Sequence, residues 1–432
     1  MSAAADAVPA EATAAERPRP PPFDRWVALV LLSLAMFGNY YVYDTIAPVA
    51  DLLTSQLGFN DQQIGLLYST YSWAAVLVLL GGGVVIDRFG TARSILVFGA
   101  ICTVAGVLTA VSSDFRVMAA GRFLLGVGAE PLIVAVTTAI AKWFKGKELS
   151  FAFGLNLTIA RLGSVAADNS PTWAQRFYTG WQPPLQIGAL LGATCLVAGV
   201  LYWILERRVA RSYQLGAAGG TDKLVFRDLF DFGKSYWYVV ALCLTFYSAI
   251  FPFRSFAIKF FMDVRGVSRE AAGALNSVLP LAAMFATPLF GLLADRIGHR
   301  ALLMAIGSLT LIPVYLLMVY SQIPLWVIIA FMGVSFSLIP AVMWPSVAYL
   351  VPEKRLGTAY ALMTLVQQVG LAGMNWLVGF TNDAAHASAA NPAGYRPGMW
   401  IFTALGFLGL VFSWLLYRSE RGPSGHGLEL VR

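Results

Sequence analysis

The chain has 432 residues, of which 58% are hydrophobic and only 12% are charged, and its mean hydropathy is +0.68. Soluble domains carry about twice that share of charge, so the composition excludes an ordinary soluble enzyme or binding domain and indicates a protein that crosses a membrane many times. The net charge of +7 is modest for this length, and nothing in its distribution indicates a nucleic-acid partner.

The first 23 residues are rich in alanine and proline, which predicts a disordered tail and not a signal peptide. Twelve apolar segments follow, each long enough to cross about 30 Å of hydrocarbon as a helix. We therefore expect an all-α membrane protein. The expected spans are 25–53, 61–86, 92–112, 115–143, 148–170, 184–205, 235–262, 268–294, 299–320, 324–350, 355–380 and 397–418.

The longest connection between these spans, residues 207–234, divides the chain into two halves. We expect a six-helix bundle on each side of it, at 24–206 and 235–420, and a short cytoplasmic tail at 421–432. Within the connection, residues 221–230 begin with a capping residue and have apolar side chains at helical spacing. This pattern predicts a short helix lying on the inner membrane face.

Lysine and arginine indicate the orientation. With both termini inside, 21 of the 30 basic residues fall in the tails, at helix ends or in the inner connections. Basic residues accumulate on the cytoplasmic side, so we expect both termini in the cytoplasm. Arginine outnumbers lysine 23 to 7 and alanine is abundant, as in proteins from GC-rich bacterial genomes. We therefore expect a bacterial inner membrane, or a lysosomal membrane if the source is eukaryotic.

The two halves are repeats of one another. The segment GVVIDRFG at residues 83–90 corresponds to GLLADRIG at residues 291–298, at an offset of 208. The same offset aligns Gly58 with Gly266 and Gly65 with Gly273. Two six-helix units with both ends inside imply parallel repeats related by an axis along the membrane normal. In transporters built this way, the substrate site lies near the midplane between the halves.

The repeated loop contains an Asp-Arg pair, Asp87 and Arg88 in the first copy and Asp295 and Arg296 in the second. The aspartates can cap or pair with the basic end of a neighbouring helix. We therefore expect an inner-face latch that is released as the protein changes conformation, with a purely structural turn as the alternative. Only the second copy continues directly into basic residues, so the two latches are expected to be unequal.

Glu130 and Arg161 lie in consecutive apolar segments joined by a basic turn, with Gly146 at its tip. They are 16 and 15 residues from Gly146, so both lie about 22–24 Å from the tip of a helical hairpin. A lone charge at this depth costs roughly 3 kcal/mol. One interpretation is a structural salt bridge. The other is a divided binding site, in which Glu130 receives a substrate ammonium and Arg161 a substrate carboxylate.

Three other residues of the same hairpin are expected to have structural roles. Gly126 and Gly128 let the fourth helix pack closely against its neighbours, and Arg122 is expected to be buried or to extend toward the membrane surface.

Asn156, just over one turn before Arg161, is expected to add a hydrogen bond to the substrate.

A second acid–base set lies in the first and seventh segments, which are repeat mates. Asp44 and Arg254 are both about 30 Å from the inner ends of their helices, and we expect them to face each other as an outer gate. An Asp44 exposed to water at a loop edge is the alternative. Lys259, further out, is expected to lie in a loop or to extend toward the surface.

Aromatic side chains cluster in the first, second and seventh segments, where packing is the alternative role for any one of them. We expect them to line a polar pocket for an amine or a peptide backbone, together with Trp344 of the tenth segment. These residues are Tyr40, Tyr41, Tyr43, Tyr68, Tyr71 and Tyr247. No spacing of residues indicates a metal site, a cofactor or a catalytic set, and Cys102, Cys195 and Cys243 each lie in an apolar run.

Several motifs resemble the major facilitator superfamily: the repeated G-x-x-x-D-R-x-G loop and the R-x-x-x-G-x-G of the fourth helix. Longer stretches are similar to its lysosomal dipeptide transporter branch, at residues 121–130, 143–149, 160–164, 344–353, 356–360 and 367–370. The resemblance implies a carrier of small dipeptides, mainly cationic ones. It also implies that Glu130 binds the substrate's amine and Arg161 its carboxylate. The family is described as a uniporter, so proton coupling is not implied.

The sequence therefore predicts a monomeric twelve-helix facilitator in the lipid bilayer that moves small zwitterionic molecules, most readily dipeptides, by alternating access. Two transport alternatives stay open. One is an organic-anion carrier that uses Arg161 and Arg254 as an anion clamp, and the other is a proton-coupled carrier of small solutes. The alternative of another class is a sensor or scaffold with this fold that does not transport.

Overall fold

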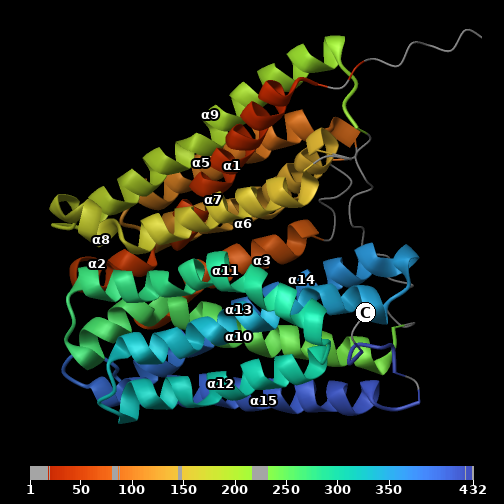
Figure 1. Cartoon of the computed structure of the whole chain (residues 1–432). Helices are drawn as coiled ribbons and strands as arrows, with labels where there is room; N and C mark the ends of the chain where they lie inside the picture. Colours follow the sequence, from red (N-terminus) through yellow and green to blue (C-terminus); the bar gives the residue numbers. More distant parts are fainter. Residues whose placement is uncertain are drawn as a thin grey trace, which may run out of the picture.

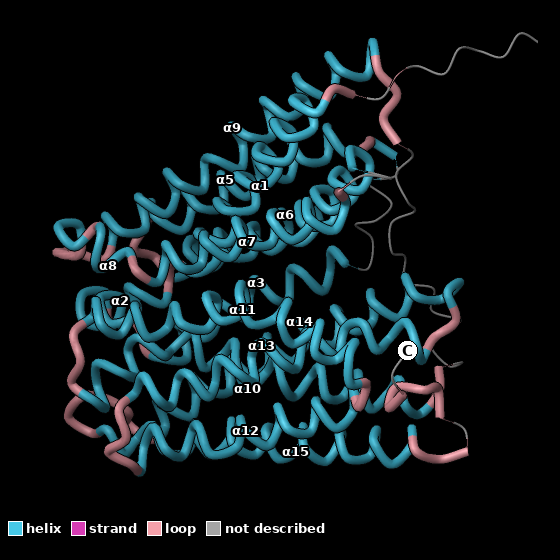
Figure 2. Tube along the Cα trace, viewed as in Figure 1, coloured by secondary structure: helices cyan, strands magenta, loops and turns pink. Residues whose placement is uncertain are grey.

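The structure is a computed structural model of the chain, and it describes residues 18, 20–79, 86, 88–144, 148–216, 232–423 and 425–430. Within these residues it consists of helices and connecting loops (Figure 2). The predicted surface helix at 221–230, Asp87 and most of the predicted tail lie outside the described residues.

The first half of the chain forms one bundle of long helices. Helix α1, Pro22–Asp44, continues through the short turn η1, Ala47–Val49, into α2, Ala50–Leu57. The helices that follow are α3 (Asp61–Leu79), α5 (Thr91–Val111), α6 (Phe115–Phe144), α7 (Leu149–Asp168), the short α8 (Ser170–Trp173) and η2 (Gln175–Phe177), and α9 (Gln182–Ser212).

The second half forms a matching bundle. Its elements are α10 (Lys234–Arg265), α11 (Arg269–Ile297), α12 (Arg300–Tyr320), α13 (Leu325–Leu350), η4 (Glu353–Arg355), α14 (Leu356–Ala384), η5 (Pro392–Tyr395) and α15 (Arg396–Glu420). In the described part of the chain, eleven helical segments are long and apolar enough to cross a membrane. Helix α3, with 19 described residues, is the twelfth helix of the arrangement, and the predicted all-α membrane fold is confirmed.

Figure 1 shows how the two bundles lie relative to each other. They meet at the end that carries α2 and α8, which we call the distal end. They diverge toward the opposite end, where α9 ends and α10 begins, which we call the terminal end. Two helix pairs make most of the contacts between the halves, α3 with α14 and α7 with α11.

The internal repeat is visible in the backbone. Gly58 and Gly266 both end a helix in the left-handed conformation, with φ of 72° and 62°, which glycine adopts without strain. Gly65 and Gly273 both lie where helices of different halves touch. A Cβ at Gly65 would lie 2.2 Å from the carbonyl oxygen of Asn375, and one at Gly273 would lie 2.1 Å from that of Asp168. The repeat mates therefore make equivalent contacts between the halves.

Helix α9 differs from its predicted span, because it continues to Ser212 and the apolar run ends near residue 205. The extra turns are stabilised by Glu206, which is only 8% exposed. Its carboxylate accepts hydrogen bonds from Lys142, at 2.6 Å, and from Thr91, at 3.3 Å. A helix can continue past its apolar segment when its polar side chains find buried partners.

Candidate functional site

A cavity of about 250 Å³ lies between the two bundles. Four helices of the first half (α1, α3, α6 and α7) and three of the second (α10, α13 and α14) contribute its walls. The residues that line it are Asn39, Tyr40, Tyr43, Tyr71, Glu130, Ile133, Arg161, Tyr247, Phe251, Trp344, Thr364, Gln367, Gln368 and Leu371. Glu130 and Arg161, predicted to lie at one depth, thus open into the same space.

Glu130 projects into this cavity from α6, immediately before Pro131. Its Oε1 accepts one hydrogen bond from the Tyr71 hydroxyl, at 3.0 Å, and one from the Gln368 amide, at 2.7 Å. Tyr71 belongs to the first half and Gln368 to the second, so the carboxylate is held from both bundles. Both partners are neutral, so neither supplies a positive charge to balance an ionised Glu130.

Arg161 projects from α7, and its guanidinium lies 5.3 Å from the centre of the Tyr40 ring. This is the range of a cation–π contact. Among the described residues, neither Arg161 nor Glu130 takes part in an ion pair within 4.0 Å. The structural salt bridge considered from the sequence is therefore not formed, and the two charges face the cavity separately.

Aromatic side chains surround these two charges. Five of the aromatic residues expected in the pocket line the cavity: Tyr40, Tyr43, Tyr71, Tyr247 and Trp344. The Trp344 indole N–H donates to the Tyr247 hydroxyl at 2.9 Å, which fixes both rings on the wall formed by the second half. The cavity thus combines a carboxylate, a guanidinium, amide groups and ring faces.

Three residues predicted as substrate contacts lie elsewhere. Asn156 is buried and accepts a hydrogen bond from Ser33 at 3.3 Å. Tyr68 packs with its ring 5.2 Å from the Arg122 guanidinium, and Tyr41 packs near Trp173, with ring centres 6.4 Å apart. The helix faces that carry these side chains point into the bundle, so the three residues are corrected to packing positions.

The glutamine pair Gln367 and Gln368 was missed as part of the site. The two adjacent amides lie inside an apolar segment, about 17 Å from the start of their helix. This position could have predicted that they belong to the site. Asn39 and Thr364 were missed as well. They belong to helix faces that hydropathy alone does not distinguish from packing faces.

Arg122 is fully buried next to the cavity. It donates to the carbonyl oxygens of Val42 and Tyr43, both at 3.0 Å. Gly126 and Gly128 lie on the same helix, and a Cβ at Gly126 would lie 2.3 Å from the Tyr71 carbonyl oxygen. These contacts tie α6 to α1 and α3, which is the structural role expected from the sequence.

Arg254 is the centre of a buried polar cluster at the distal end. Its guanidinium lies 3.6 Å from the Asp44 carboxylate and donates to Asp168 at 2.8 Å. Asn276 donates to the other oxygen of Asp168 at 2.7 Å. Asp44 is only 6% exposed, so the alternative of a water-exposed loop acid is wrong. Asp168, an acid inside a predicted span, was missed.

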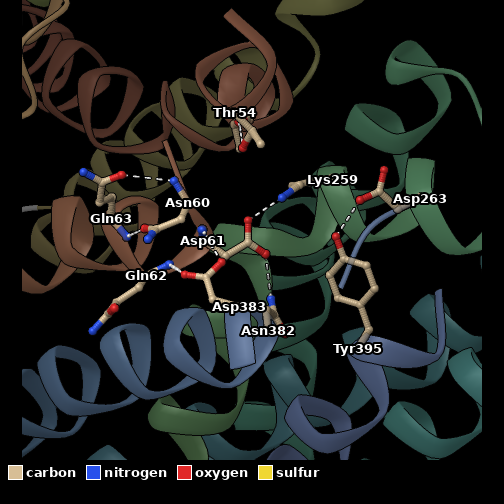
Figure 3. A network of polar contacts seen from close by, with 11 residues as sticks. Thr54, Asn60, Asp61, Gln62, Gln63, Lys259, Asp263, Asn382, Asp383 and Tyr395 are labelled. Atoms are coloured by element: carbon tan, nitrogen blue, oxygen red, sulfur yellow. Dashed lines mark hydrogen bonds and ion pairs between the residues drawn. The ribbon is translucent and has the colours of Figure 1, made fainter. Parts of the chain in front are cut away.

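Figure 3 shows a second distal cluster, around Asp61 at the start of α3. Lys259 and Asn382, both from the second half, bind its carboxylate. Asp383 accepts hydrogen bonds from the backbone N–H groups of Asp61 and Gln62, at 2.9 and 2.8 Å, and so caps the N-terminus of a helix in the other half. Lys259 is 8% exposed, and its predicted loop or surface position is wrong.

The distal clusters share one pattern of charge. In each of their ion pairs the acid comes from the first half and the base from the second. The pairs are Asp44 and Asp168 with Arg254, Asp61 with Lys259, and Asp51 with Arg269. This complementarity joins the bundles at the distal end.

The loop motif at the terminal end makes a different kind of contact. Asp295 pairs with Arg300 at 2.7 Å, and Arg300 begins the next helix of the same half, α12. Arg88 and Arg296 are exposed. The latch role of this motif stays a prediction, since the described contact remains within one bundle.

These features match a known class of membrane protein. The sequence profile of the Major Facilitator Superfamily matches residues 32–268 and 253–429, and together the two matches cover both bundles. The chain therefore belongs to the Major Facilitator Superfamily. It is a multi-pass membrane transporter and not an enzyme.

Individual relatives narrow the comparison. The lysosomal dipeptide transporter MFSD1 of Bos taurus is 32% identical over 417 residues, which are 93% of this chain and 87% of the bovine protein. The Homo sapiens protein of the same name is 31% identical over 417 residues, covering 93% and 88%. Among solved structures, a bacterial homologue of the human lysosomal transporter Spinster has a TM-score of 0.72 at 17% identity, covering 93% of this chain and 98% of its own.

Proposed function

We propose that this transporter carries dipeptides, which it holds by their two charged ends. Glu130 binds the α-ammonium group and Arg161 binds the α-carboxylate. The observation that carries the proposal is that these two opposite charges line one cavity of about 250 Å³. Among the described residues, neither is paired with another charged side chain. A zwitterionic ligand supplies a counter-charge to both residues, and each charge of the ligand is paired in turn.

The other groups of the cavity fit the same ligand. Gln367 and Gln368 offer amide donors and acceptors suited to a peptide bond, and the tyrosine rings favour an ammonium group near their faces. Similarity to the MFSD1 proteins over 93% of the chain supports a dipeptide over other zwitterions.

The organic-anion alternative requires Arg254 to act with Arg161 as an anion clamp. Arg254 is instead engaged by Asp44 and Asp168 and is 4% exposed. A substrate carboxylate would have to displace those of Asp44 and Asp168 from Arg254. This requirement disfavours an organic-anion carrier.

We further propose that the protein works by alternating access as a monomeric uniporter, with both termini in the cytoplasm and, in a bacterial source, in the inner membrane. The excess of basic residues in the tails and connections of the terminal end supports this orientation. The distal clusters around Arg254 and Asp61 then act as an outer gate, which opens when the acids of one half separate from the bases of the other.

A thermal-shift panel tests the binding site directly, because a ligand that binds only the folded state raises its apparent stability. We expect Ala-Ala to raise the melting temperature of the purified transporter. N-acetylated Ala-Ala, Ala-Ala amide, free alanine and succinate are each expected to give little or no shift, because each lacks one charged end or the spacing between the ends. A shift with succinate but not with Ala-Ala would contradict the proposal and favour an anion carrier.

A further inference from the structure

Two smaller cavities adjoin the central one, one next to each charged residue. The first, of about 220 Å³, shares Glu130, Ile133 and Thr364 with the central cavity and lies among α3, α6 and α14. The second, of about 360 Å³, shares Arg161, Tyr247 and Trp344 with it and lies among α7, α10, α11 and α13. We call them the Glu130 lobe and the Arg161 lobe. They lie at the two helix pairs that join the halves.

The walls of both lobes are largely apolar. Val134 and Ala361 line the Glu130 lobe, and Ala283, Met284 and Phe336 line the Arg161 lobe. Among the described residues, the only charged side chain in each lobe is the one for which it is named. In the proposed complex Glu130 and Arg161 are already bound to the two ends of the dipeptide, so a charged ligand side chain in either lobe would lose water without gaining a counter-ion of its own, which is unfavourable.

The geometry of a dipeptide connects each lobe to one of its residues. The Cα that carries the ammonium group also carries the first side chain, and the Cα that carries the carboxylate also carries the second. In an extended chain, successive side chains point to opposite sides. A dipeptide bound to Glu130 and Arg161 by its ends thus directs its first side chain toward the Glu130 lobe and its second toward the Arg161 lobe.

We propose that these two lobes are the side-chain subsites of the transporter and that they select neutral, mainly apolar side chains, with the larger residue at the second position. This inference rests on the proposed function and adds the substrate class to it. The difference in volume, 360 against 220 Å³, sets the positional preference. The lack of a second charge in either lobe disfavours dipeptides with acidic or basic side chains.

Two matched substitutions test the assignment, since each fills one lobe with the same side chain. Ala283→Phe narrows the Arg161 lobe and Ala361→Phe narrows the Glu130 lobe. For the unaltered protein we expect tighter binding of Ala-Phe than of Phe-Ala, and of Ala-Leu than of Ala-Lys or Ala-Asp. Ala283→Phe should weaken Ala-Phe by about tenfold and leave Phe-Ala nearly unchanged, as expected for losing room for one side chain. Ala361→Phe should do the reverse.

Ala-Ala serves as the control ligand, because its methyl groups need little of either lobe and its binding reports that a variant is folded. Equal weakening of Ala-Phe and Phe-Ala by both variants would overturn the subsite assignment, as would tighter binding of Ala-Lys than of Ala-Leu, and the proposed function would stand. Should the unaltered protein bind no dipeptide at all, the proposed function fails and the subsites fail with it.

Discussion

Replacing Glu130 with glutamine is expected to reduce dipeptide binding by about 100-fold, since truncating one partner of a buried charge pair costs about 2–5 kcal/mol. Glutamine keeps the shape of the side chain and still bonds with Tyr71 and Gln368, which hold Glu130 at 3.0 and 2.7 Å. The fold should therefore survive, and the loss should come from the missing counter-charge for the ammonium group. Titration of Ala-Ala into purified protein measures it.

A chemical control makes this prediction specific. N-acetylated Ala-Ala has no ammonium group, so the Glu130→Gln variant should bind it about as well as it binds Ala-Ala, whereas the unaltered protein should discriminate strongly. Glu353→Gln provides the matched protein control, because Glu353 is an exposed acid outside the cavity. If Glu130→Gln still discriminated between the two ligands as the unaltered protein does, Glu130 would not be the ammonium site.

Replacing Arg254 with glutamine is expected to destabilise the closed distal end by about 3–5 kcal/mol, the usual effect of removing one member of a buried ionic cluster. Asp44 and Asp168 are 6% and 0% exposed, and without Arg254 their charges would repel each other with no cation between them. Transport should fall, and a cysteine introduced at Asn39, which is 3% exposed and lines the central cavity, should react faster with a membrane-impermeant thiol reagent added from the distal side. The measurement compares labelling rates in a background without the three native cysteines.

The control for this variant lies on the same helix. Arg265 donates to the carbonyl oxygens of Met318 and Ser321 within the second half and does not bridge the bundles, so Arg265→Gln should leave the labelling rate unchanged. Adding Asp168→Asn to Arg254→Gln should restore part of the lost stability, because it removes one of the unpaired charges. Unchanged transport and labelling in both Asp44→Asn and Arg254→Gln would end the gate proposal.

The fold could be predicted because its signals are local. A run of apolar residues defines a membrane helix wherever it lies in the chain, and the repeat needed only the comparison of one half with the other. Gly58 and Gly266 are an example: the sequence aligned them, and both adopt the same left-handed conformation.

The site could be predicted only in part, because depth follows from counting residues but the rotation of a helix about its axis does not. Counting placed Glu130 and Arg161 at one depth, and both reach the cavity. It could not tell that Tyr40 lines the cavity whereas its neighbour Tyr41 packs in the bundle. It also could not tell whether the two charges pair or stand apart.

Contacts between the halves were the hardest to predict. Gln368 lies 238 residues from its partner Glu130, and Asp383 lies 322 residues from the Asp61 amide that it binds. No periodicity connects such positions. The only signal was that Asp168 and Lys259 are charged residues within apolar segments. Burying an unpaired charge there is energetically unfavourable, so each is expected to have a partner, but the sequence does not identify it.

The most direct test of dipeptide transport is uptake of labelled Ala-Phe into liposomes that contain the purified protein. We predict saturable uptake that unlabelled dipeptides compete for and that N-acetylated or amidated dipeptides do not. Its initial rate at equal internal and external pH should match that measured with a pH gradient, as expected for a uniporter. Uptake no greater than in empty liposomes, or uptake of succinate in place of Ala-Phe, would contradict the account.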